Sequence, residues 1–247
     1  MKSQILSILF VISINLHKAS IIIELPICDY SYINGTAIAS SQQNINILGN
    51  ASNYAVLAGS ATTNAGATTV VGDMGVSPST SIYGTAVTLI MGSFHVGDTN
   101  SLDAQGSLLK AYNYLAAIPN ERDMTGTDLV GLTLSPGTYA FTSSAFLSAG
   151  ILTLNGKAND LWVFQIATTL ITSVNAKVLV TGGGSPFNVY WKVGSSATIA
   201  GGTTMIGNIV AYADITFGYN ANLDGRALAL NGQISLNTNI ISRVPCK

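Results

Sequence analysis

The sequence predicts a mainly β fold in which the chain winds as a solenoid, and the strongest indication is a near-regular repeat in its last quarter. The pattern Ser196–Ile199 returns at Asp214–Phe217 and again at Gln233–Leu236, at spacings of 18 and then 19 residues. A second pattern keeps the same step, since Gly207–Ile209 returns as Gly225–Ala227. Fixed periods near this length are typical of solenoids, whose stacked coils bury one shared core. The 25 glycines and a charged fraction of only 9% agree with a β-rich chain that makes many turns.

Composition and charge exclude one class of partner. The 247 residues carry a net charge of −1, and the ten Lys and Arg residues are scattered without a cluster. A nucleic-acid-binding protein needs a basic face that displaces counterions from phosphates, so we expect no nucleic acid partner. Because β architectures often run to about 200–250 residues as one unit, we expect a single domain over residues 40–247.

Residues 1–39 resemble a secretory leader. Lys2 precedes the apolar stretch Ile5–Ile14, and small residues follow at Thr36–Ala39, as in a signal peptide with its cleavage site. His17 and Lys18 interrupt the apolar stretch, so no run reaches the roughly 18 apolar residues that span a bilayer. We therefore expect a secreted, extracellular protein without a membrane anchor after processing, although the pattern leaves the cleavage site open.

The two cysteines, Cys28 and Cys246, do not form a disulfide framework. Removal of the leader takes Cys28 away and leaves Cys246 as an unpaired thiol near the chain end. Asn34 and Asn50 each begin a glycosylation sequon, which is used only on a secretory route.

Strand-like segments begin at Tyr54 and are separated by Gly, Asn and Pro. They are Tyr54–Ala58, Val70–Val71 and Val87–Met91, and their composition is typical of short strands between turns.

One helix, near residues 101–118, interrupts the strands. Thr99 or Ser101 can cap it and Pro119 closes it, as helix ends require. Apolar residues recur inside it at helical spacing, so we expect this stripe to pack along the solenoid; the residues are Leu102, Leu109, Tyr112 and Leu115.

Strands resume at Leu132–Leu134 and continue to Ile241, so the helix divides the coil into two parts. Ile151–Leu154 and Leu161–Ile166 are the next two strands. In the repeating strand the apolar residues set the register, because side chains alternate between the two faces; they are Ala197, Ile199, Ile215, Phe217, Ile234 and Leu236. The outward set is therefore Ser196, Thr198, Asp214, Thr216, Gln233 and Ser235.

Seven motifs in order resemble the microbial ice-binding family with a discontinuous β-solenoid, and together they span residues 47 to 241. They are Leu48-Gly49 with Asn53–Ala58, Gly72–Pro78, Leu134–Tyr139, Trp162–Ile166, Asn188–Ala197, Gly207–Ile209 and Leu223–Leu228. The resemblance implies a right-handed solenoid of triangular section with one long α-helix packed alongside. It also implies an ice crystal surface as the partner, bound by one flat face so that ice growth and recrystallisation are inhibited.

The resemblance places Ser60–Ala65 on the same face in the first coil, where the family has an inward apolar residue at the position of Thr62. Ala61, Thr63 and Ala65 then point outward. In the coil that begins at Trp162, we expect Leu170 to point inward and Thr169 and Ile171 outward.

The expected face is a grid with two regular spacings. Outward side chains recur about 6.7 Å apart along a strand, and coils stack about 4.8 Å apart; both repeats lie near lattice spacings of hexagonal ice. Thr suits such a face, because its χ1 is stiff and its hydroxyl can hold a water. Ile171, Asp214 and Gln233 depart from a strict Thr pattern. The plain alternative is that these are ordinary solvent-facing strand residues.

The sequence offers few candidate residues for a catalytic or metal-binding cluster. The chain has eleven carboxylates, and the nearest approach to a cluster pairs Asp214 and Asp224 with Lys192 and Arg226. Asp224 and Arg226 are two residues apart and are expected to form a surface ion pair. His95 near Asp98 hints at a metal, but a lone His does not make a usual site. We expect no enzyme activity, no cofactor and no metal.

Two other functions stay open at this stage. An extracellular adhesive or carbohydrate-binding solenoid typically exposes a line of aromatic rings, and Tyr190, Tyr212 and Tyr219 do not fall in one register. A polysaccharide-degrading enzyme needs the carboxylate cluster that is missing. An ice-binding face must also stay uncovered, so we expect a monomer.

Overall fold

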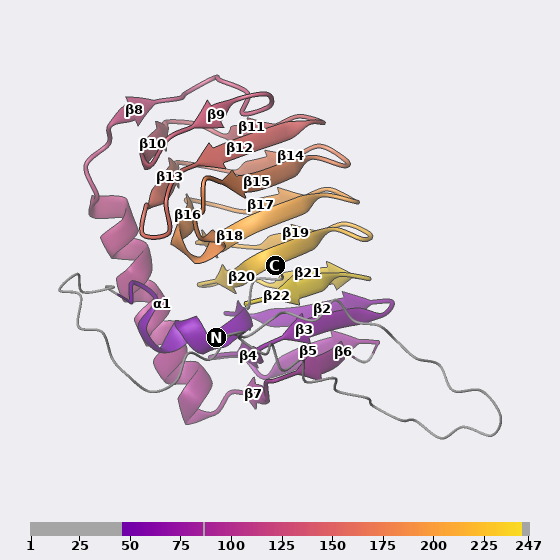
Figure 1. The fold of residues 1–247 in the computed structure, drawn as a ribbon. Helices are drawn as coiled ribbons and strands as arrows, with labels where there is room; N and C mark the ends of the chain where they lie inside the picture. The colour runs from indigo at the N-terminus through magenta and orange to yellow at the C-terminus, as the bar shows by residue number, and fades with distance from the viewer. Residues whose placement is uncertain (1–45, 86, 244–247) are drawn as a thin grey trace, which may run out of the picture.

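The computed structural model describes residues 46–85 and 87–243 (Figure 1). The expected leader at 1–39, both cysteines and the sequon at Asn34 lie outside these residues. Asn50 lies within them and is exposed. The described chain forms parallel strand stacks with one α-helix beside them, which confirms the mainly β class. No helix in this part of the chain has the length and apolar character needed to cross a membrane.

The strands form three parallel stacks, and the first of them faces the helix. From one end to the other its order is β7 (Phe94–Val96), β4 (Asp73–Val76), β1 (Tyr54–Ala58), β20 (Asn222–Ala229), β18 (Thr204–Ala211), β16 (Val189–Val193), β13 (Trp162–Ile166), β10 (Gly137–Phe141) and β8 (Arg122–Asp123).

The second stack is a separate seven-stranded sheet. Its order is β11 (Ala145–Leu147), β14 (Leu170–Thr172), β17 (Ala197–Ile199), β19 (Ile215–Phe217), β21 (Ile234–Asn237), β2 (Ala61–Ala65) and β5 (Ser81–Gly84).

The third stack shares two long strands with the first. Its order is β9 (Thr133–Leu134), β12 (Ile151–Asn155), β15 (Lys177–Thr181), the first halves of β18 and β20, β22 (Ile240–Ser242), β3 (Thr68–Val71) and β6 (Val87–Ile90). Gly207 and Gly225 lie where the two long strands change stack, at φ of +103° and +155°. Only glycine adopts such backbone angles readily, so these two residues turn the chain from one face to the next.

The order of strands in the stacks is not the order in the sequence. β1 pairs with β20, β2 with β21 and β3 with β22, so the last coil stacks directly on the first. The helix α1 (Thr99–Ala117) runs alongside the strands and carries the chain from β7 at one end to β8 at the other (Figure 1). The solenoid is therefore discontinuous, as the two-part coil predicted.

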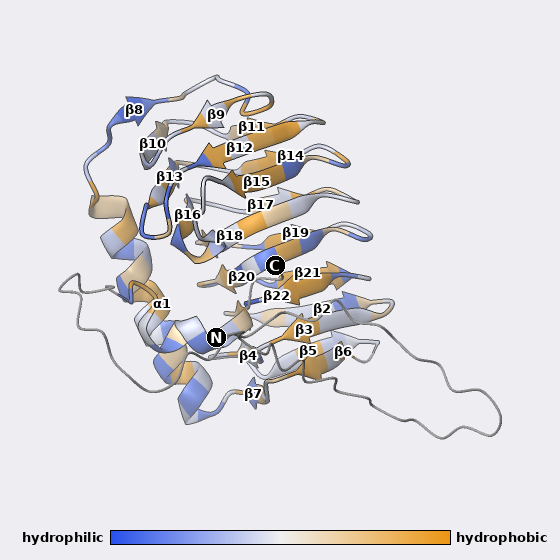
Figure 2. Ribbon diagram, in the orientation of Figure 1, coloured by the Kyte–Doolittle hydropathy of each residue, from blue (hydrophilic) through white to orange (hydrophobic). Residues whose placement is uncertain are grey.

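The core lies between the three stacks, and Figure 2 shows hydrophobic residues on strands along its whole length. Three aromatic rings stack on one another across adjacent coils: Tyr139 on Phe164 at 5.3 Å between centroids, and Phe164 on Trp191 at 4.0 Å. The indole N–H of Trp191 donates to the carbonyl of Ile206 at 2.9 Å. Coil-to-coil stacking of large rings gives the solenoid its rigidity.

Helix α1 packs on the first stack through a different stripe from the one expected. The buried residues are Ser101, Ala104, Leu108, Ala111 and Leu115, whereas Leu102 and Leu109 are 57% and 50% exposed. The expected stripe was therefore wrong at Leu102 and Leu109, whereas Leu115 is buried and Tyr112 is half-buried against the same cluster. Two alanines let the helix lie close to the sheet, and a larger side chain would hold it away.

The helix also begins earlier than expected, because its cap is neither Thr99 nor Ser101. The Asp98 carboxylate accepts the backbone N–H of Ser101 at 2.8 Å and caps the helix. Asp98 was not among the expected caps, but Asp is as good a cap as Ser.

The expected surface ion pair between Asp224 and Arg226 is also wrong. Gly225 turns the chain between them, so the two residues belong to different stacks, and no ion pair joins them within residues 46–85 and 87–243. Arg226 is buried, and its guanidinium donates to Asn208 Oδ1 at 2.8 Å and to the carbonyl of Ser52 at 3.0 Å. Burial lowers the pKa of Arg226 to about 10 and raises the pKa of Asp224.

Candidate functional site

The second stack brings the predicted site residues together on its outer face. In the register Ile171↔Thr198↔Thr216↔Ser235↔Thr63, equivalent side chains lie directly above one another in five successive coils. We call these five residues the second outer row. Residues one position to either side, such as Leu170, Ala197 and Ile215, are buried. The alternation of side chains along each short strand thus determines the outer face.

A parallel row lies two residues earlier in the chain, at the start of β2 and immediately before β14, β17, β19 and β21. The same register aligns Thr169, Ser196, Asp214, Gln233 and Ala61, which we call the first outer row. Asp214 and Gln233 are exposed and the other three are half-buried. Ala65 is exposed at the end of β2, opposite Asn237 of β21. All eleven predicted residues therefore lie in, or directly before, the strands of one sheet.

Hydrogen bonds between neighbouring coils hold several of these side chains. Thr63 Oγ1 donates to Ser235 Oγ at 3.1 Å, across the junction between the first and the last coil. Asp214 Oδ1 accepts the backbone N–H of Gln233 at 2.8 Å, and the hydroxyl of Ser196 accepts the N–H of Asp214 at 3.3 Å. These bonds restrict the motion of the Thr63, Ser235, Ser196 and Asp214 side chains.

The inner side of β2 is more polar than the rest of the stack. Thr62 is buried, at the position where the resemblance implies an apolar residue, and its hydroxyl has no hydrogen-bond partner among the described residues. Asn64 is also buried, and its amide donates to the carbonyls of Gly66 and Thr85 at 3.1 Å. Both point away from the outer rows, so the departure at Thr62 leaves the outer face unchanged.

Sequence reasoning missed four residues that extend the two rows. Ser144 and Phe146 continue them through β11, and Ser81 and Tyr83 through β5. The alternation of side chains around Ala145 and Ile82 could have indicated these four residues. Neither strand, however, shares the repeating pattern of the last quarter of the sequence. Phe146 and Tyr83 are 47% and 62% exposed, so the bulky side chains stand at the two ends of the face and the small ones between them.

The other two stacks present less regular outer surfaces. Helix α1 covers much of the first stack, where Leu57, Val163, Val210 and Leu228 pack against it. On the third stack the aligned outward residues mix charge and size, since Lys177 lies opposite Ile151 and Thr204, and the exposed Leu179 lies opposite Thr153. The second stack is therefore the uncovered face with the smallest and least charged side chains.

A family model described as ice-binding-like matches residues 56–242. The chain belongs to this family. The matched range contains both outer rows and the whole of helix α1, and the expected resemblance is confirmed.

Known relatives agree in sequence and in fold. An ice-binding protein of Nostoc sp. (strain HG1) is 45% identical over 201 residues, which are 80% of this chain and 74% of the relative. Among solved structures, the ice binding protein from an Antarctic biological consortium is 42% identical, with a TM-score of 0.76 over 79% of this chain and 89% of that one. The ice-binding protein of the Antarctic ascomycete Antarctomyces psychrotrophicus is 36% identical, with a TM-score of 0.76, and the match covers 80% of this chain and 98% of that one.

Family membership agrees with the chemistry of the outer rows. Their side chains are hydroxyls, methyls, one amide and the single carboxylate of Asp214, without a nucleophile and base in contact. Across the described residues, no group of three or more His, Cys, Asp or Glu side chains could hold a metal ion. The arrangement can order water but offers no acid and base pair.

Proposed function

We propose that this protein binds ice through the two outer rows of the second stack, arresting the growth of ice crystals and inhibiting their recrystallisation. The observation that carries the proposal is the register of Ile171, Thr198, Thr216, Ser235 and Thr63, which repeats one outward position through five coils. Membership of the ice-binding-like family supports it.

The physical basis is a match between two lattices. Parallel strands lie about 4.8 Å apart and outward residues about 6.7 Å apart along a strand, and both repeats are close to spacings in hexagonal ice. Threonine methyls disfavour random hydration and hydroxyls hold waters in place. Because the coils are rigid, many weak contacts form together with little loss of conformational entropy.

We also propose the handedness and the cross-section of the solenoid. A right-handed solenoid of triangular section gives each stack a nearly flat side, and flatness is what a crystal surface demands. The three parallel stacks and the corner glycines Gly207 and Gly225 support this shape.

We further propose that the protein is a secreted monomer without enzyme activity, metal or cofactor. The support is the leader-like residues 1–39, the scattered basic residues and the need to keep the outer rows uncovered. Nucleic acid and membrane are not proposed as partners.

One bulky substitution tests the site. Thr216→Tyr places a ring in the middle of the second outer row and should abolish most ice-growth arrest, because it lifts a flat face off a flat lattice. The fold should persist, since an exposed position usually tolerates such a change to within about 0.5 kcal/mol. The measurement is the growth of single ice crystals in dilute protein under a microscope.

Thr88→Tyr is the matched control. Thr88 is also exposed on a strand, but it lies in β6 of the third stack. Its ice-growth arrest should equal that of the parent protein. Unchanged arrest in folded Thr216→Tyr, or loss in Thr88→Tyr alone, would move the site to another face.

A further inference from the structure

A pocket of about 200 Å³ lies on the side of the first stack that faces helix α1. Tyr190 of β16 and Arg226 of β20 line it. Two short 3-10 helices close its remaining sides, η1 (Gly49–Asn53) and η2 (Pro186–Asn188). None of these elements belongs to the second stack, so the pocket takes no part in the proposed ice contact.

Arg226 brings a positive charge into this pocket without a counter-ion. The residue is 8% exposed, and no ion pair joins it to a carboxylate within the part of the chain that the structure describes. None of the described residues that line the pocket is an Asp or a Glu. Burial, and with it the positive charge of Arg243, lowers the pKa of Arg226. Because a buried charge without a partner is costly, an anion in the pocket would stabilise this guanidinium.

The guanidinium of Arg226 is fixed on one side and free on another. Its Nε donates to the carbonyl of Ser52 at 3.0 Å, and its Nη1 donates to Asn208 Oδ1 at 2.8 Å. Its Nη2 makes no hydrogen bond within residues 46–85 and 87–243, and it is not among the unpartnered atoms that the described chain seals from solvent. The two fixed contacts therefore position a donor that a ligand can reach.

Tyr190 supplies a second free donor on the same side of the stack. The register Tyr190↔Asn208↔Arg226 places the three residues on neighbouring strands with their side chains on one face. The bond to Asn208 on the middle strand draws the guanidinium toward Tyr190. Burial raises the pKa of Tyr190 against the opposing effect of the Arg226 charge, so its hydroxyl keeps its proton. This hydroxyl also has no partner among the described residues and is not sealed from solvent.

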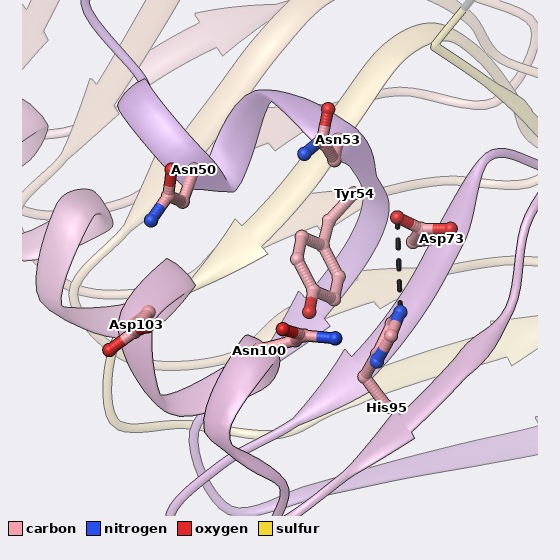
Figure 3. Close-up of a pocket in the computed structure, with 7 residues that line it drawn as sticks. All are labelled: Asn50, Asn53, Tyr54, Asp73, His95, Asn100 and Asp103. Atoms are coloured by element: carbon pink, nitrogen blue, oxygen red, sulfur yellow. Dashed lines mark ion pairs between the residues drawn. The ribbon is translucent and has the colours of Figure 1, made fainter.

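The larger pocket around Tyr54, of about 280 Å³, has a different character (Figure 3). His95 lies 2.8 Å from Asp98 Oδ2 and 4.0 Å from Asp73 Oδ2. Asp103 lies across that pocket and points away from Asp73 (Figure 3). The carboxylates there are paired with His95 or face solvent, whereas Arg226 lacks a partner of opposite charge among the described residues.

We propose that the pocket beside Arg226 binds a small monocarboxylate with a short carbon chain. A carboxylate matches both free donors, since one oxygen accepts from the guanidinium and the other from the hydroxyl of Tyr190. The single cation among the described lining residues matches a single negative charge, which favours a carboxylate over a dianion such as phosphate. Leu48 and Phe187 give the carbon chain an apolar wall.

The test is isothermal titration calorimetry of the full chain with sodium propionate at fixed ionic strength. Propionamide is the neutral probe of the same size. We expect propionate to bind saturably at one site and propionamide not to bind. Tyr190→Phe should weaken propionate binding about tenfold, because it removes one hydrogen-bond donor to a charged acceptor. The variant should fold like the parent, since the lost hydroxyl has no partner among the described residues.

Arg226→Lys provides a second variant, which keeps the charge and removes the planar fork. It should abolish measurable propionate binding, with its fold checked by circular dichroism. If the loss of the contacts to Ser52 and Asn208 unfolds it, Tyr190→Phe decides the test. Tyr219→Phe is the matched control, because Tyr219 is exposed in the turn before β20 and its loss of a hydroxyl should leave propionate binding unchanged. Ice-growth arrest should equal that of the parent in both Tyr→Phe variants, which separates this site from the proposed ice contact.

Four results would overturn the proposal. They are the absence of saturable propionate binding, equal affinity for propionamide, binding of sodium phosphate in place of propionate, and unchanged propionate affinity in folded Tyr190→Phe. The last would place the bound carboxylate elsewhere on the surface.

Discussion

Asp214 is the single carboxylate in the two outer rows, and its surroundings explain how a strand of this face tolerates it. Its Oδ1 accepts the backbone N–H of Gln233 in the next coil at 2.8 Å, so part of its charge stabilises the coil-to-coil contact. The remainder faces solvent and orders its own hydration shell, which competes with the lattice of a crystal. At the scale of single residues, the face therefore combines regular rows with one charged position.

Replacing both Asp214 and Gln233 by Thr should strengthen ice-growth arrest, because two more coils then carry a short hydroxyl side chain in the first outer row. The cost in stability should be near 0.5 kcal/mol per site, as for other exposed changes. Crystal growth rate against protein concentration is the measurement. Gln233→Thr alone is the control, since it leaves the Asp214 hydrogen bond acceptor in place. Equal or weaker arrest in the double variant would mean that the irregularity is part of how the face works.

Helix α1 shows how an element is placed by small residues as much as by large ones. Ala104, Leu108, Ala111 and Leu115 form the contact with the first stack, and Gln165 fastens the far end by donating to the carbonyls of Leu115 and Ile118 at 2.7 Å. The helix thereby covers one stack and leaves the second stack free.

Leu108→Ala should destabilise the protein by about 2–5 kcal/mol, because it leaves a cavity under a fully buried side chain. Leu109→Ala changes the same residue type on the exposed side of the helix and should stay within about 0.5 kcal/mol of the parent. Urea unfolding followed by circular dichroism distinguishes the two variants. Equal losses at both positions would contradict the packing face described above.

Asp98 should make the stability of the protein depend on pH in the acid range. The backbone N–H of Ser101 and the side chain of His95 lower the pKa of Asp98 from 3.8 to about 2. A carboxyl group whose pKa is lower in the folded state stabilises it above the unfolded value, and the contribution is lost as pH falls from 3.8 to about 2. Asp98→Asn keeps a capping side chain but cannot titrate, so its stability should fall less steeply over that range.

Urea midpoints measured across this pH range provide the comparison. Asp123 and Asp128 also have lowered pKa values and titrate in both proteins, so the difference between the two curves isolates Asp98. Parallel curves would show that the cap does not depend on the charge.

At the scale of the whole molecule, the three stacks are closed by long-range contacts. The last coil rests on the first through β1, β2 and β3, and the aromatic stack of Tyr139, Phe164 and Trp191 continues the core through the other part. Strand pairing and packing between neighbouring coils thus make the solenoid rigid.

Ice-growth arrest should survive exhaustive chelation, and light scattering should report a single chain. Asp214 opposes a dry homodimer through the outer rows, because two like charges would meet near the symmetry axis. The measurements are crystal growth with and without a chelator, and the molar mass in solution. Loss of arrest in chelator that a divalent ion restores would favour the adhesive alternative.

Much of the architecture follows from the sequence by itself. The recurrence of Ser196–Ile199 at 18 and 19 residues predicted stacked coils, and the alternation within each block determined which side chains face outward. Both are local properties, since a strand must send successive side chains to opposite faces. The motifs from Leu48 to Leu228 were equally readable, and the family match over residues 56–242 confirmed the resemblance.

Only the tertiary structure decided which distant segments meet. Thr63 and Ser235 are 172 residues apart and share a hydrogen bond. No local sequence pattern predicts that the last coil stacks on the first. The helix face, the burial of Arg226 and the pocket around Tyr54 likewise depend on several elements at once. The periodicity of a segment shows which of its side chains share a face. Which other segment packs against that face depends on how the whole chain folds.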